Sequence, residues 1–181
     1  MRKDLFFESS MCDEGIIDGV SSRVAELGFA LRVTHHPGIA HEVVHTGEMI
    51  CVLPPNHPLA ERPVVSAPDL IGLPFIGLER GTRLGEAVRE SFAQAGAPFQ
   101  PIVEVRYCNT ACVLAAAGVG AAVVDPFSPR QSGGQGIRPF TPKTVAVAYM
   151  LWSEAEPLSR LAKAFLHEVR QASRSLDQDV S

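Results

Sequence analysis

The sequence predicts an α/β fold divided into two lobes. Short apolar runs typical of strands alternate with amphipathic stretches typical of helices, an order that favours sheets covered by helices. The alternation forms two groups, near residues 4–47 and 48–140, and a final strand and helix follow them. We therefore expect lobe one to comprise residues 1–47 plus 141–181 and lobe two residues 48–140. A chain of 181 residues can bury a sizeable core without disulfide bonds or metal ions.

Lobe one is predicted to open with a strand at residues 5–9 and a helix within 12–24. The helix is indicated by Ile16, Ile17, Val20 and Val24, which fall on one helical face. A near-continuous apolar run at 26–31 predicts a buried strand, so the opening resembles a βαβ unit and implies parallel pairing. Residues 41–53 predict one long strand, or two strands that meet near Gly47.

Lobe two is predicted to repeat the strand–helix pattern. A strand at 73–78 precedes a helix within 80–96, whose Leu84, Val88 and Phe92 repeat every four residues and which Gly96 can end. A strand at 102–107 precedes a helix with Asn109 or Thr110 as its N-cap. A buried strand within 119–126 and a Gly- and Ser-rich loop at 128–136 complete the lobe.

The final elements are a strand at 145–152 and a helix after Pro157. Leu158, Leu161, Phe165 and Val169 are spaced to share the core-facing side of that helix. Having no obvious partner in the second group, these two elements are expected to return to lobe one.

The composition excludes several classes of protein. With 46% hydrophobic and 20% charged residues, intrinsic disorder is excluded. A net charge of −4 argues against direct DNA binding by this chain, because phosphate-binding domains are usually basic. No apolar run reaches 18 residues and the first residues do not resemble a signal peptide, so we expect no membrane partner. Four cysteines are too few for a disulfide scaffold, which favours free thiols in a cytoplasmic protein.

Residues 41–45 spell the zinc-protease motif H-E-x-x-H. The motif requires a helix, which holds both histidines on one face with the glutamate as the base. Here Pro37-Gly38 precede the motif and β-branched Val43-Val44 lie inside it, so a strand is favoured. On a strand the two histidines would lie about 13 Å apart, too far to share one ion.

Other motifs carry little chemistry. Cys108 and Cys112 are interpreted as small buried core residues rather than metal ligands. Gly118-x-Gly120 follows a helix and precedes a strand, the reverse of a dinucleotide-binding loop. We therefore expect no catalytic residue, no metal and no cofactor.

Small polar residues occupy three strand-to-helix junctions: Ser9-Ser10, Gly81-Thr82 and Asn109-Thr110. The carboxyl edge of an open α/β sheet is where ligands bind, and free N–H groups at helix starts favour carboxylates. Plain N-capping requires the same residue types and remains the alternative.

Several segments carry a resemblance to a known family. Residues 47–82, GEMICVLPPNHPLAERPVVSAPDLIGLPFIGLERGT, and then ACVLAAAGVGAAVVDPF, resemble the effector-binding domain of LysR-type transcriptional regulators. RPFTP, VAVAYMLW and SRLAKAFLHEVRQ resemble the closing crossover, strand and helix of that domain. The VVDPF and RPF pieces look most like the members that respond to opines and amino acids.

The resemblance implies a two-lobed fold of the type 2 periplasmic-binding-protein kind, with a small effector between the lobes. Carried over, the effector contacts fall on Ser9, Ser10, Gly81, Thr82, Asn109 and Thr110, and Asp125 at a strand end is expected to line the cleft. The effector is expected to be an amino acid, an opine or another organic acid. The resemblance also implies a homodimer or higher oligomer, with the helix in 12–24 against the helix of 82–96 of a partner.

The chain departs from the family pattern at its start. The DNA-binding domain and linker helix of the family have no counterpart here. LFFESS aligns with the second strand, so we expect the first strand and helix of lobe one to be missing. The alternative functions are a transport-type solute-binding protein and, less favoured, a zinc hydrolase using His41, Glu42 and His45.

Overall fold

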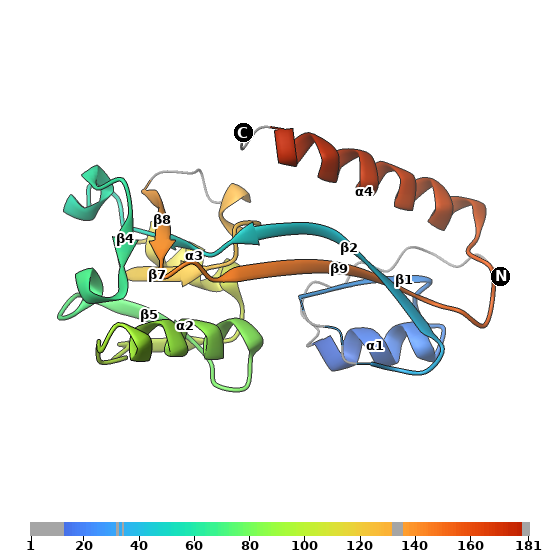
Figure 1. The fold of residues 1–181 in the computed structure, drawn as a ribbon, viewed down its shortest axis with the longest axis horizontal. Helices are drawn as coiled ribbons and strands as arrows, with labels where there is room; N and C mark the ends of the chain where they lie inside the picture. The colour runs from blue at the N-terminus through green and yellow to red at the C-terminus, as the bar shows by residue number, and fades with distance from the viewer. Residues whose placement is uncertain (1–12, 32, 34, 132–135, 179–181) are drawn as a thin grey trace. The chain divides into compact units, whose positions relative to one another are not determined.

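The structure is a computed structural model that describes residues 13–31, 33, 35–131 and 136–178. Its residues group into two compact units (Figure 1). Unit 1 runs up to Thr46 and resumes at Val147, and unit 2 comprises Gly47–Ala146. The strand expected at residues 5–9 lies outside the described residues.

Unit 1 is built from a three-stranded sheet and two helices. The strands lie in the order β1-β9-β2, and β1 runs antiparallel to β9 with Leu27 opposite Trp152. The described elements are α1 (Asp13–Ser21), β1 (Leu27–Ala30), β2 (Ile39–Glu48), β9 (Val145–Ser153) and α4 (Arg160–Gln178). The helix and strands predicted from residue 12 onward are confirmed as elements, including the final strand and helix. Leu161 was expected to face the core but is 58% exposed, and Ala162 and Leu166 are buried instead. The parallel pairing implied for β1 is not seen in the described part, where its partner is the antiparallel β9.

The two helices of unit 1 cover opposite faces of its sheet, as Figure 1 shows. Gly28 of β1 faces α1, because a Cβ placed there would lie 2.6 Å from the side chain of Ile16. The next residue, Phe29, contacts Phe165 of α4 edge to face, with ring centroids 6.1 Å apart. Successive residues of a strand point to opposite faces, so β1 is packed on both sides. The core on the α1 side contains Ile17, Val20, Ala30, Ile39 and Leu151.

Unit 2 contains a six-stranded sheet in the order β4-β8-β3-β7-β5-β6. β5 runs parallel to both β6 and β7, whereas β3 runs antiparallel to β7 and β8. Its strands are β3 (Ile50–Val52), β4 (Val65–Ser66), β5 (Phe75–Leu78), β6 (Val103–Val105), β7 (Ala121–Val124) and β8 (Ile137–Thr141). Its α-helices are α2 (Arg83–Gln94) and α3 (Cys108–Ala116), and its 3-10 helices are η1 (Pro58–Glu61), η2 (Ala67–Leu70) and η3 (Ser128–Gln131).

The pattern of unit 2 is predicted correctly where the periodicity is strong. The long extended stretch divides into β2 and β3 next to Gly47, and Gly96 ends the helical segment at φ +65°. The sequence reasoning misses β4 and β8, and the segment expected to be a loop starts with η3. Pro139 lies inside β8 opposite Ile50, and proline normally argues against a strand because it donates no ladder hydrogen bond.

Two further predictions concern membrane spans and the segment that contains His41 and His45. In the described part of the chain, no helix is long and apolar enough to cross a membrane. His41 and His45 both lie on β2, so the extended form predicted for this segment is confirmed.

We predict that Leu151→Ala lowers the free energy of unfolding by about 2–5 kcal/mol, because Leu151 is fully buried and its truncation leaves a cavity. Urea denaturation followed by circular dichroism measures the change. The matched control is Leu161→Ala on α4, where the side chain is 58% exposed, and it should change stability by less than about 0.5 kcal/mol. Equal losses in the two variants would contradict the packing of unit 1 described here.

Candidate ligand-binding edge of unit 2

Three parallel strands of unit 2 end at the same edge of its sheet. β5 leads into α2, β6 leads into α3, and β7 leads into Asp125. Because β5 is parallel to both neighbours, the residues that follow these strands share the carboxyl edge. The edge therefore brings together Gly81, Thr82, Asn109, Thr110 and Asp125, whereas Ser9 and Ser10 lie outside the described residues.

The junction between β5 and α2 is organised around Thr82, the N-cap of α2. Its hydroxyl donates to the carbonyl oxygen of Glu79 at 2.8 Å and accepts the N–H of Gly85 at 3.1 Å. Gly81, with φ +82°, reverses the chain just before the cap, a conformation that glycine adopts at low cost. The Thr82 proton is thus committed within the junction, and the hydroxyl acts as a helix cap.

Gly85 permits this close packing. A Cβ at this position would lie 2.3 Å from the Glu79 carbonyl oxygen and 2.6 Å from the Thr82 hydroxyl. Any side chain would therefore push the first turn of α2 away from the end of β5. The glycine is needed for close approach and not for an unusual backbone angle.

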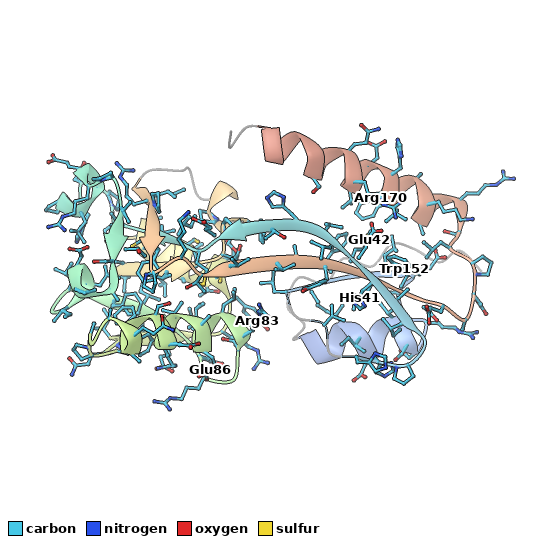
Figure 2. All side chains as sticks on the ribbon, viewed as in Figure 1. His41, Glu42, Arg83, Glu86, Trp152 and Arg170 are labelled. Atoms are coloured by element: carbon cyan, nitrogen blue, oxygen red, sulfur yellow. The ribbon has the colours of Figure 1, made fainter. Side chains whose placement is uncertain are left out.

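The start of α2 already carries a negative charge. The Gly81 N–H donates to the carboxylate of Glu86 at 3.1 Å, and both Arg83 and Glu86 are exposed on this first turn (Figure 2). Carboxylates are favourable at helix starts because the backbone N–H groups there bear partial positive charge. Within the described residues, the amides of Arg83 and Leu84 at the start of the helix have no hydrogen-bond acceptor.

The junction between β6 and α3 differs from the sequence prediction. Tyr107 is the N-cap of α3 and provides no side-chain cap, and the helix starts at Cys108. Asn109 and Thr110, predicted as caps, instead occupy the first turn with exposed side chains. The prediction is wrong because the chain becomes helical directly after the strand, before either polar residue is reached.

The two junctions are connected through the backbone. The Glu79 N–H donates to the Val105 carbonyl oxygen at 2.9 Å, one residue beyond the end of β5. Glu79 and Arg106 also lie 4.0 Å apart, but both side chains are nearly half exposed, so this ion pair contributes little. The backbone bond therefore fixes the spacing between the start of α2 and the start of α3.

Asp125 faces inward from the end of β7. Asp125 is only 3% exposed. Its carboxylate accepts the N–H groups of Phe127 and Ser128 at 2.8 Å each and the Ser128 hydroxyl at 2.9 Å. These hydrogen bonds stabilise the turn after β7. The Asp125 carboxylate is therefore engaged in that turn, whereas the sequence predicted that it would line a cleft.

Arg89 of α2 stabilises the carboxyl edge of the sheet, and sequence reasoning missed this residue. Its guanidinium donates from Nη2 to the Leu78 carbonyl oxygen at 3.1 Å and to the Glu104 carboxylate at 2.8 Å. It also lies 4.1 Å from the centroid of the Phe99 ring, a favourable cation–π position. A single side chain therefore ties α2 to the end of β5 and to β6.

The described cysteines are buried and poorly suited to nucleophilic chemistry. Burial, with a contribution from Asp69, raises the pKa of Cys51 to about 12. Burial and the nearby Asp125 charge raise the pKa of Cys112 to about 11 and that of Cys108 well above its usual value. A thiol acts as a nucleophile when ionised, so these three are packing residues, as was expected for Cys108 and Cys112. Cys12 lies outside the described residues.

The H-E-x-x-H motif does not have the geometry that zinc binding requires. Its residues lie on β2, where positions four apart are separated by about 13 Å. Glu42 instead accepts two hydrogen bonds from Arg170 of α4, at 2.8 and 2.5 Å (Figure 2). His41 packs edge to face on Tyr149, with ring centroids 5.9 Å apart. The residues of the motif therefore help to hold α4 and the sheet of unit 1 together.

Comparison with known proteins gives a consistent result. A family model described as the LysR substrate binding domain matches residues 9–174. The transcriptional activator protein LysR of Escherichia coli strain K12 is 30% identical over 118 residues, which are 64% of this chain and 38% of that protein. The regulatory protein NocR of Agrobacterium tumefaciens strain T37 is 28% identical over 113 residues, 62% of this chain and 38% of that protein. The chain thus matches well under half the length of these relatives.

Solved structures show the same fold. The effector binding domain of QuiR in complex with shikimate has a TM-score of 0.68 and 17% identity, covering 91% of this chain and 79% of that one. The regulatory domain of Synechocystis PCC6803 CcmR in complex with 2-PG has a TM-score of 0.71 and 16% identity, covering 90% and 80%. The fold is α/β, of the type 2 periplasmic-binding-protein kind.

We predict that Gly85→Ala destabilises the chain by about 1–3 kcal/mol, because the added methyl group collides with backbone that cannot move freely. Thermal and urea unfolding measure the loss. The control is Gly19→Ala in α1, where a Cβ has no neighbour within 4 Å and alanine should be neutral or stabilising. A neutral Gly85→Ala would show that the first turn of α2 is not packed tightly on β5.

We also predict that stability falls as the pH rises above about 9. Thiols ionise near pH 9.0 in the unfolded chain, whereas in the folded chain Cys51 ionises only at about 12. The raised pKa therefore favours the folded state fully below pH 9, and this contribution is lost between pH 9 and 12. Urea unfolding of wild type and Cys51→Ala at several pH values measures the effect. The variant should show the shallower decline, and parallel curves would contradict the burial of this thiol.

Proposed function

Because the chain belongs to the family of LysR substrate-binding domains, we propose that it is the effector-sensing part of a LysR-type transcriptional regulator. In this role it binds a small molecule and performs no catalysis. Family membership favours a sensor over the transport-type solute-binding protein that the sequence analysis kept as an alternative. The strand geometry of residues 41–45 removes the basis of the zinc-hydrolase alternative.

The proposed ligand carries a carboxylate that binds at the carboxyl edge of β5, β6 and β7. The observation that carries this proposal is the pair of amides at Arg83 and Leu84 without a hydrogen-bond acceptor, beside the start of α3, which no side chain caps. Two helix starts connected by one backbone hydrogen bond favour an anion more strongly than a single helix start. Amino acids, opines and other organic acids share the required group.

The Thr82 side chain contributes indirectly in this proposal. Since its hydroxyl caps α2, its task is to hold the Arg83 and Leu84 amides in place. The exposed Asn109 and Thr110 are the side chains available for direct contact. Asp125 positions the end of β7, since its carboxylate is engaged with Phe127 and Ser128.

The remaining parts of the proposal follow the family pattern. Lobe one corresponds to residues 1–47 plus 141–181 and lobe two to 48–140, with Ser9 and Ser10 completing the site from lobe one. The regulator is proposed to act in the cytoplasm as a homodimer or higher oligomer. The binding of a small molecule is supported by the QuiR and CcmR domains, which were solved in complex with shikimate and with 2-PG.

The proposal predicts that removing one backbone N–H weakens carboxylate binding. Arg83 is the first residue of α2, a position that tolerates proline, and Thr82 before it is extended at φ −87° and ψ 141°. Arg83→Pro deletes the amide proton and the side-chain charge, whereas the control Arg83→Ala deletes the charge alone. A charge-assisted hydrogen bond contributes about 1.5–3 kcal/mol, so Arg83→Pro should bind about 10- to 150-fold more weakly than Arg83→Ala.

The measurement begins with a thermal-shift screen of amino acids, opines and aromatic acids, and the best ligand is then titrated calorimetrically. Equal affinities of the proline and alanine variants would exclude the Arg83 amide from the site. Failure of the wild-type chain to bind any member of the panel would contradict the proposed ligand class.

A further inference from the structure

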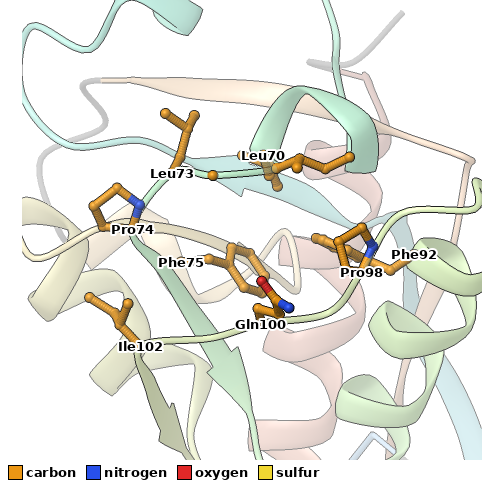
Figure 3. A pocket seen from close by; sticks show the side chains of 10 residues that line it. Leu70, Leu73, Pro74, Phe75, Phe92, Pro98, Gln100 and Ile102 are labelled. Carbon is orange, nitrogen blue, oxygen red and sulfur yellow. The ribbon is translucent and has the colours of Figure 1, made fainter.

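Unit 2 also has a pocket without charged side chains at the opposite edge of its sheet. Ten residues line a cavity of about 280 Å³ (Figure 3). Phe75, the first residue of β5, lies in it, and Ile102 lines it just before β6. Leu78 at the other end of β5 is three residues away, which corresponds to about 10 Å along a strand. The pocket is therefore separate from the edge proposed to bind the effector.

The floor of the pocket is aromatic and firmly held. Phe75 and Phe92 are each only 2% exposed, and their ring centroids lie 5.2 Å apart. Phe99 packs edge to face against both rings, at 5.6 Å from Phe75 and 5.3 Å from Phe92. The rings pack against one another and present little surface to the pocket, so the cluster gives the pocket a rigid base.

One wall of the pocket is formed by η2 and the turn after it, and both are fixed by hydrogen bonds. The Asp69 carboxylate accepts the Ser66 N–H at 2.9 Å and the Ser66 hydroxyl at 2.6 Å, and it pairs with Arg62. The Leu73 N–H then donates to the Leu70 carbonyl oxygen at 3.2 Å. The leucines of this wall are thus held in position before any ligand arrives.

The lining side chains are apolar apart from Gln100, and backbone groups add polar surface. None of its ten residues is charged, and Gln100 provides its one side-chain amide. Pro74 and Pro98 have no backbone N–H to donate. A ligand therefore finds apolar side chains, polar backbone groups and one side-chain amide but no charge, a mixture found in small-molecule sites.

The helix ends near the pocket disfavour anions. Phe92 lies in the last turn of α2, and Pro98 follows soon after that helix ends. Helix C-termini carry partial negative charge, and here the Phe92 carbonyl oxygen accepts the Ala97 N–H at 2.9 Å. An anion would face this charge with no lining cation to balance it, and its desolvation would be costly.

We propose that this pocket is a second ligand site, which binds a small uncharged aromatic molecule of one or two fused rings. Size supports this class, since an apolar cavity of about 150 Å³ accommodates benzene. The rim supports it as well, because Ile71 and Ile102 are 50% and 60% exposed and a bound ring would remove part of that apolar surface from water. The proposal stands on unit 2 alone and does not depend on the proposed effector function.

The test uses indole as a neutral probe and indole-3-carboxylate as its anionic counterpart. Titration of the ¹⁵N-labelled full chain, followed by NMR, should shift the amides of Gly72, Leu73, Gln100 and Ile102. With indole the shifts should saturate in the millimolar range, whereas indole-3-carboxylate should leave these amides unshifted at the same concentrations. Shifts that are scattered over the chain or never saturate would overturn the proposal, as would equal binding of the two probes at these residues.

Two variants localise the effect. Ile102→Glu places a charge on the exposed rim and should weaken indole binding at least fivefold, whereas Val113→Glu charges a comparably exposed site on α3 and should leave it unchanged. If Ile102→Glu loses the dispersed spectrum of the folded chain, Ile71→Glu serves instead. Unchanged indole affinity in a folded rim variant would overturn the proposal. Arg83→Pro should not alter indole binding, so failure of the effector proposal can be told apart from failure of this one.

Discussion

The parallel pairing of β5 with β6 and β7 is the constraint on which the candidate site depends. The register sets Leu78 opposite Val105, and the Glu79 N–H extends this ladder by one bond to the Val105 carbonyl oxygen. Both helices that follow must then start within a few residues of the same edge. A slip of one residue would turn every side chain of β5 to the other face of the sheet. Since all four residues of β5 are buried, such a slip is strongly opposed by packing.

Arg89 shows how a long-range contact maintains this arrangement. It is 11 residues from Leu78 and 15 from Glu104 in sequence, and nothing around it distinguishes it from the other arginines. Among the described residues, its Nε is a buried nitrogen without a hydrogen-bond acceptor, which is unfavourable. The bonds from Nη2 and the Phe99 ring offset that cost. We interpret Arg89 as a positioning residue for the end of β5 and not as a ligand contact.

The sequence predicts the elements that a local pattern determines, and it fails where contacts between distant residues determine the structure. Periodicity located α2 because Leu84, Val88 and Phe92 are all buried by one sheet, and the local pattern carries that information. The start of α3 was misplaced because capping preferences are weaker than the geometry imposed by β6, which leads into the helix at Tyr107. β8 was missed because its position depends on pairing with β3 and β4, residues that are distant in sequence. Small polar residues at the strand-to-helix junctions predicted this edge and the family resemblance pointed to the same residues, but only the structure separates the inward Asp125 from the exposed Asn109 and Thr110.

The two edges of unit 2 acquire opposite chemistry from a single cause. In a parallel strand–helix unit, helices start near the carboxyl ends of the strands and finish near their amino ends. The partial positive charge of the helix starts therefore gathers where Thr82 caps α2, and the partial negative charge of the helix ends lies where Phe92 and Pro98 line the pocket. The residues follow this polarity: Glu79, Arg80, Gly81 and Thr82 succeed β5, whereas Leu73 and Pro74 precede it. One edge is consequently suited to an anion held by backbone amides, and the other to a neutral ring held by apolar contact.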